Sequence, residues 1–184
     1  MILTKENTET LIAKCRCHDR NAQLEIYNRY YKAMYNTTYR IIKDPTEAED
    51  IMQEAFLTAF TKLSSLEKNS MFGAWLKRIV INASLTALKK NNKYEEVALD
   101  VVDYKLSDET YESSEKEVCC HKIDIVLETL KQLKTNYSTI LSLYLIEGYD
   151  YEEIAEIMNI SNSNCRTLVS RAKQSLKKKL LLTQ

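Results

Sequence analysis

Two neighbouring stretches decide the fold of this chain: residues 44–60, which read DPTEAEDIMQEAFLTAF, and residues 72–82, which read FGAWLKRIVIN. The first opens with a strong helix start, because Asp44 can act as the N-cap, Pro45 suits the first helical position and Glu47 is placed as in a capping box. In both stretches the apolar residues recur at intervals of three or four, which indicates amphipathic helices. The residues expected to face a core are Ala48, Ile51, Met52, Ala55, Phe56, Ala59, Leu63, Trp75, Leu76, Ile79, Val80 and Ala83.

The first of these helices has a second face of distinct composition, formed by Asp50, Gln53, Glu54 and Leu57. Mixed charged and apolar contact gives an interface orientation as well as affinity. The alternative is an ordinary solvated helix face. Since the neighbouring helix is aromatic and basic, the pair suggests a protein that holds a large partner with one surface and DNA with others.

Composition favours helices throughout. Apolar residues make up 45% of the 184 residues, yet the chain has only two Gly and one Pro, too few for the turns of sandwiches or barrels. No apolar run approaches the ~18 residues that a membrane span needs. The first ten residues, MILTKENTET, lack the layout of a secretory signal. We therefore expect an all-α, cytoplasmic protein without membrane insertion.

Three parts follow one another along the chain. Residues 8–92 carry helical patterns, and residues 118–182 are helical again. Residues 93–117 between them are polar and aperiodic, and residues 91–120 carry nine acids and three lysines, a net charge of −6. The pattern predicts two small helical domains joined by an acidic flexible linker. The apolar stripe expected between residues 22 and 42 consists of Leu24, Tyr27, Tyr31, Met34, Tyr35, Thr38, Ile41 and Ile42.

The last part ends in a helix-turn-helix pattern. Gly148 suits a helix C-terminus, Asp150 and Glu153 form a second helix start, and a short turn at residues 159–161 precedes a helix capped by Ser161 or Ser163. The apolar positions of the helices before that turn are Ile123, Val126, Leu127, Leu130, Leu133, Tyr137, Ile140, Leu141, Tyr144, Leu145, Ile154, Ala155, Ile157 and Met158.

The final helix has the composition of one that reads DNA. Residues 163–184 carry two Arg, four Lys and no acid. Short polar side chains can reach base edges in the major groove, while Arg and Lys hold phosphates. The alternative is a solvated basic face, but the turn length, the caps and the lack of acids favour DNA binding. The inward positions are Cys165, Leu168, Val169, Ala172, Leu176 and Leu180, and the DNA-facing ones are Asn164, Arg166, Thr167, Ser170, Arg171 and Lys173.

The five cysteines do not form a recognisable metal motif. Both histidines lie beside cysteines, in Cys15-x-Cys17-His18 and Cys119-Cys120-His121. Zinc-binding cysteines usually have two to four residues between them, whereas these pairs have one or none, and such spacings do not place both thiols on one helix face. We expect free thiols, no metal and no cofactor.

At the quoted residues the chain resembles the ECF (extracytoplasmic function) sigma factors of the sigma-70 family, over about residues 8–180. The most specific block is EAEDIMQEAFLTAF followed by FGAWLKRIVIN, and the second is GYDYEEIAEIMNIS with the basic helix after it. The resemblance implies sigma region 2 in residues 8–92 and sigma region 4 in residues 118–182.

The resemblance also implies a partner for each surface. The 44–63 helix would bind bacterial core RNA polymerase through Asp50, Gln53, Glu54 and Leu57, and the last helix would read the promoter −35 element. The loop at residues 66–71 would capture a base flipped from the −10 strand. An anti-sigma factor is implied as an inhibitor. The implied −10 contacts are Lys68, Asn69, Ser70, Lys77, Arg78, Asn82 and Lys89.

Phe72 and Trp75 could stack on bases, but their helical register favours packing in the core.

Two other classes of function compete with this interpretation. A free-standing regulator could use only the C-terminal helix-turn-helix, with the N-terminal helices as a dimerisation or sensor module, and a palindromic target would favour it. The two-domain layout argues against it. An enzyme is not expected, because the chain has no phosphate-binding glycine loop and no nucleophile beside a base.

Overall fold

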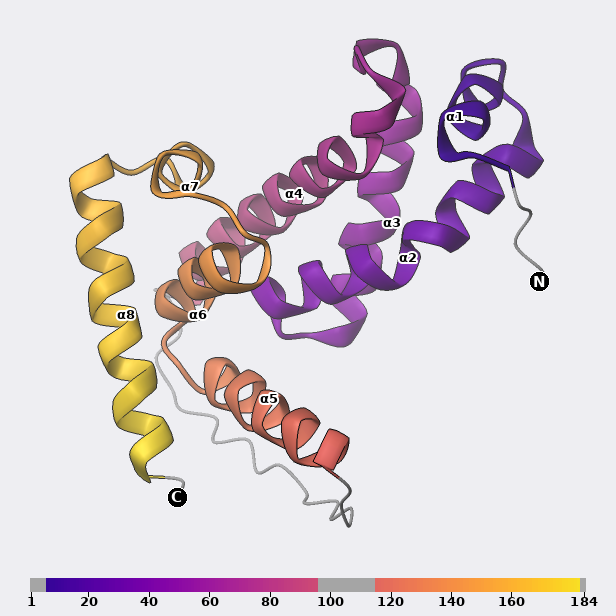
Figure 1. Ribbon diagram of the computed structural model, residues 1–184. Helices are drawn as coiled ribbons and strands as arrows, with labels where there is room; N and C mark the ends of the chain where they lie inside the picture. The colour runs from indigo at the N-terminus through magenta and orange to yellow at the C-terminus, as the bar shows by residue number, and fades with distance from the viewer. Residues whose placement is uncertain (1–5, 96–114, 183–184) are drawn as a thin grey trace. The chain divides into compact units, whose positions relative to one another are not determined.

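The computed structural model describes residues 6–95 and 115–182, and side chains are described outside residues 91–95 and 115–122 (Figure 1). Every regular element in these ranges is helical, which confirms the all-α prediction. The chain divides into two compact units, residues 1–90 and residues 91–184. Most of the predicted linker lies outside the described residues. No described helix combines the length and the hydropathy that a bilayer span requires.

The first unit contains four α-helices and two short 3₁₀ turns. Both α2 and α3 begin at an aspartate whose carboxylate accepts backbone N–H groups: Asp19 from Asn21 and Ala22, and Asp44 from Glu47. Pro45 occupies the first helical position of α3, as predicted. The elements are α1 (Thr8–Arg16), α2 (Arg20–Ile42), α3 (Pro45–Thr61), η1 (Leu63–Ser65), η2 (Asn69–Met71) and α4 (Phe72–Glu95).

Aromatic residues from three helices hold the core of the first unit together. Phe56 of α3 and Phe72 of α4 are buried, with Tyr27 and Tyr30 of α2 packed against them at ring centroid distances of 4.8 and 5.3 Å. All the core residues expected in α3 are buried, which confirms the stripe read from the sequence. The expectation for Leu24 was wrong, because its side chain is 43% exposed. The inward stripe of α2 passes instead through Ala22 and Ile26.

The second unit ends in the predicted helix-turn-helix. Asp150 and Glu153 form a complete capping box at the start of α7, and Ser161 Oγ accepts the backbone N–H of Asn164 in the first turn of α8. Gly148 has φ +78°, the left-handed conformation predicted for it. The elements are α5 (Glu115–Lys131), α6 (Thr135–Leu141), η3 (Ser142–Ile146), α7 (Tyr151–Met158) and α8 (Asn162–Leu182).

The core stripes of the second unit deviate from the sequence prediction at two positions. Leu145 is 49% exposed, whereas Leu143 is buried. They lie in η3, a single π-helical segment with a backbone bond from Glu147 to Ser142, and its wider turn shifts which side chains face inward. Ile123 is 53% exposed, whereas the half-buried and buried side chains described in α5 begin at Val126.

Candidate polymerase and DNA interfaces

The outer face of α3 carries the four residues predicted to contact a large partner. Asp50, Gln53, Glu54 and Leu57 are all exposed, and their spacing places them in one stripe along the helix. Leu57 is 68% exposed, so this face offers an apolar side chain for contact as well as charged ones. Gln53 donates a 3.3 Å hydrogen bond to Glu49, which holds part of this acidic stripe in place. The face is acidic at one end and apolar at the other.

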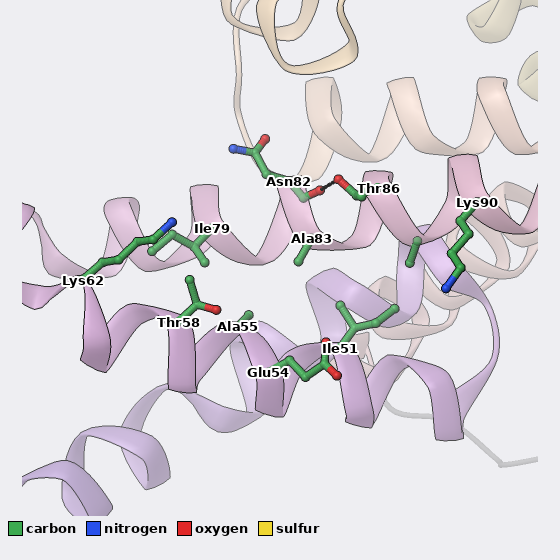
Figure 2. Close-up of a pocket in the computed structure, with 11 residues that line it drawn as sticks. Ile51, Glu54, Ala55, Thr58, Lys62, Ile79, Asn82, Ala83, Thr86 and Lys90 are labelled. Atoms are coloured by element: carbon green, nitrogen blue, oxygen red, sulfur yellow. Dashed lines mark hydrogen bonds between the residues drawn. The ribbon is translucent and has the colours of Figure 1, made fainter.

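A groove of about 540 Å³ lies between α3 and α4, as Figure 2 shows. Glu54 from the predicted polymerase face and Asn82 from the predicted −10 set both line it, with Lys62 and Lys90 among the residues at its rim. The Asn82 amide points away from α3, while its backbone carbonyl accepts the Thr86 hydroxyl at 2.8 Å. The structure thus brings together residues that the sequence assigned to two different contacts.

The segment between α3 and α4 is a folded loop. The buried side chains of Leu63 and Leu66 anchor it, and backbone N–H groups of Leu66 and Met71 close its two 3₁₀ turns. Lys68 and Ser70, two of the three predicted base-facing residues, are exposed. The third, Asn69, is half-buried and bonds to α1.

Arg16 is a contributor to this loop that sequence reasoning missed. Its Nη2 donates to the Leu66 carbonyl at 2.6 Å and to Asn69 Oδ1 at 3.1 Å. These partners lie 50 and 53 residues away in the chain, so no local pattern could have joined them.

The remaining predicted −10 residues lie along α4. Asn82 and Lys89 are exposed, whereas Lys77 and Arg78 are half-buried. Phe72 is buried, and Trp75 packs beside it with ring centroids 6.0 Å apart. Phe72 lies in the core and the partly buried Trp75 packs against it, which confirms the expectation that these aromatics pack inward.

One side of α8 carries exposed polar and basic side chains. Val169, Ala172 and Leu176 are buried on the opposite side. The exposed positions include all six residues predicted to read DNA: Asn164, Arg166, Thr167, Ser170, Arg171 and Lys173.

Two of these basic residues, Lys173 and Arg166, lie over a pair of tyrosines. The sequence predicted only packing for Tyr144 and no role for Tyr151. The rings of Tyr144 and Tyr151 stack at 5.2 Å, and the Tyr151 hydroxyl donates to that of Tyr144 at 3.4 Å. Lys173 Nζ lies 4.1 Å from the Tyr144 centroid, and Arg166 Cζ lies 5.9 Å from that of Tyr151. The bond from Tyr151, and then Lys173, lower the pKa of Tyr144.

Cysteines contribute no metal centre in the described part of the chain. Cys15, Cys17 and Cys165 are free thiols, and no group of three or more His, Cys, Asp or Glu among the described residues is placed to hold a metal ion. Burial raises the pKa of the Cys15 thiol to about 11. The Cys119-Cys120-His121 side chains lie outside the described residues.

Comparison with known families identifies both units. The model of Sigma-70 region 2 matches residues 26–94, and that of Sigma-70, region 4 matches residues 123–176. The chain belongs to the sigma-70 family. Among relatives of this sigma factor, the RNA polymerase sigma-H factor of Pseudomonas aeruginosa is 28% identical, over 97% of this chain and 96% of that protein. The ECF RNA polymerase sigma factor SigM of Bacillus subtilis is 29% identical, over 83% of this chain and 91% of SigM. These matches place the chain in the ECF group.

Solved structures share the fold of this ECF sigma factor. The structure of CnrH in complex with the cytosolic domain of CnrY matches with a TM-score of 0.57 at 19% identity, covering 96% of this chain and 99% of that one. The sigma factor RpoE in complex with the anti-sigma factor NepR from Bartonella quintana matches with a TM-score of 0.59 at 21% identity, covering 85% and 94%. By the residues that the two family models match, region 2 includes the α3 face and the loop after it, and region 4 includes most of α8.

Proposed function

We propose that this sigma factor binds bacterial core RNA polymerase in the cytoplasm, recognises the −10 and −35 promoter elements and helps open the duplex without chemistry of its own. The observation that carries the proposal is the presence of region 2 and region 4 in one chain, each with its expected contact face exposed. In region 2, α3 offers the mixed stripe from Asp50 to Leu57. In region 4, α8 offers polar and basic side chains suited to a major groove.

Regulation by a protein inhibitor extends this proposal. RpoE, a structural neighbour, is in complex with an anti-sigma factor. We propose an anti-sigma factor for this chain too, covering surfaces that otherwise bind polymerase or DNA.

Complex formation with core polymerase tests the proposal. Wild-type protein should co-elute with core polymerase in size exclusion, and Asp50→Asn/Glu54→Gln should weaken the complex because it removes the two charges of the α3 stripe. Glu9→Gln/Glu152→Gln removes two exposed charges elsewhere and serves as the matched control. A protein that binds DNA but stays apart from core polymerase would instead be a free-standing regulator.

A further inference from the structure

The loop between α3 and α4 is fixed from outside by α1. The Arg16 guanidinium, at the last residue of α1, donates to the Leu66 carbonyl at 2.6 Å and to Asn69 Oδ1 at 3.1 Å. Hydrogen bonds from a charged donor are about twice as strong as those between neutral groups. Leu11, Ile12 and Cys15 of α1 are buried in the same core as Leu63 and Leu66, so the arginine projects from a rigid support.

The side-chain amide of Asn69 forms two hydrogen bonds within the protein. Its Oδ1 accepts from Arg16, and its Nδ2 donates to the Glu9 carbonyl at 3.4 Å. An asparagine amide offers two N–H donors and two acceptor lone pairs, so half of these positions are already engaged. Lys68 and Ser70, on either side, are exposed.

From this geometry we infer that Arg16 is a positioning residue for the −10 contact, and that Asn69 anchors the loop to α1 while Lys68 and Ser70 face the captured base. The inference rests on the proposed function and deepens it. Base capture must compensate for the loss of stacking, which costs a few kcal/mol. A loop that is already ordered adds no ordering cost of its own, so pre-organisation by α1 makes capture tighter.

The test uses full-length protein assembled with core polymerase. Its ligand is a fluorescently labelled single strand of DNA, whose sequence the wild-type holoenzyme has first selected from a random library. Arg16→Ala and Asn69→Ala should each weaken binding of that strand, by about tenfold if one charge-assisted bond is lost. The double variant should lose less affinity than the two single losses multiplied, because Arg16 and Asn69 share one hydrogen bond although each also has a bond of its own. Arg16→Lys should restore part of the affinity. Arg20→Ala removes an exposed charge on α2 and is the matched control.

Hydrogen exchange of the free protein separates positioning from direct contact. Arg16→Ala and Asn69→Ala should speed exchange of the Leu66 and Met71 amides, which close the loop. Lys68→Ala and Ser70→Ala should weaken strand binding without changing that exchange. Affinity for core polymerase should stay the same in all these variants.

Two results would overturn the inference. The first is that Arg16→Ala leaves both the amide exchange and the strand affinity at their wild-type values. The second is that the double variant loses affinity by the full product of the two single losses. A wild-type protein that forms no holoenzyme, or a holoenzyme that selects no sequence, would instead refute the proposed function, and with it the assignment of Lys68 and Ser70. The exchange measurement still shows in that case whether Arg16 orders the loop.

Discussion

Leu57 offers the sharpest test of the polymerase-binding face. Its side chain is 68% exposed on α3, so Leu57→Ala removes little that holds the fold together. Alanine is also the strongest helix former, so α3 should remain intact. The effect of the substitution should therefore appear in binding and not in stability.

The magnitude follows from the exposed fraction. Complete burial of a leucine side chain is worth about 1.5–3 kcal/mol. About two-thirds of that side chain is still exposed here, so its burial against core polymerase should contribute roughly 1–2 kcal/mol. A loss of this size corresponds to a dissociation constant about 5- to 30-fold higher.

The assay is a titration of fluorescently labelled protein with core polymerase, accompanied by thermal unfolding of each variant. Leu24→Ala is the matched control, since Leu24 is 43% exposed but lies on α2, outside the proposed face. We expect a weaker complex for Leu57→Ala and wild-type affinity for Leu24→Ala, with little change in the unfolding of Leu57→Ala. Wild-type affinity in Leu57→Ala would refute the assignment of this face. A large loss of stability would show that Leu57 serves packing instead.

Three further predictions concern other parts of the chain. Asp150→Ala should cost the second unit about 1 kcal/mol in chemical denaturation, since it removes the acceptor for the Glu152 and Glu153 amides; unchanged stability would mean that the capping box contributes nothing. Arg171→Gln should make the fall of log affinity with log salt for promoter DNA less steep, by about 1 in the slope, whereas Lys134→Gln, outside α8, should leave the slope unchanged. Burial raises the pKa of the Cys15 thiol from its ordinary 9.0 to about 11, so the folded state favours the neutral thiol. The free energy of unfolding should hold below pH 9 and fall as pH rises towards 11, and Cys15→Ala should flatten that fall; an equally steep fall in the variant would contradict the assignment.

Local signals in the sequence predicted the helix boundaries well. Asp44 with Pro45 and Asp150 with Glu153 cap the helices that they were expected to start, because an N-cap side chain bonds to backbone N–H groups only two or three residues further on. The buried stripe of α3 was also predicted in full, since an unbroken helix repeats its inward face at a constant interval.

Errors arose where the regular repeat does not decide burial. Leu145 was misplaced because a π-helical turn cannot be read from apolar spacing, and Ile123 because periodicity does not show where a helix begins to pack. In the candidate site, the exposed face of α8 followed from its periodicity. The Arg16–Asn69 bond and the stacking of Tyr144 on Tyr151 join different elements, so only the tertiary structure reveals them.

Transcription in vitro tests the central claim most directly. Core polymerase would be supplied with this protein and a library of duplex genomic fragments, and the 5′ ends of the transcripts would be mapped. The account predicts transcripts with defined starts that need the protein, preceded by shared −10 and −35 elements. Transcripts that are the same with and without the protein, although it binds DNA, would contradict the account.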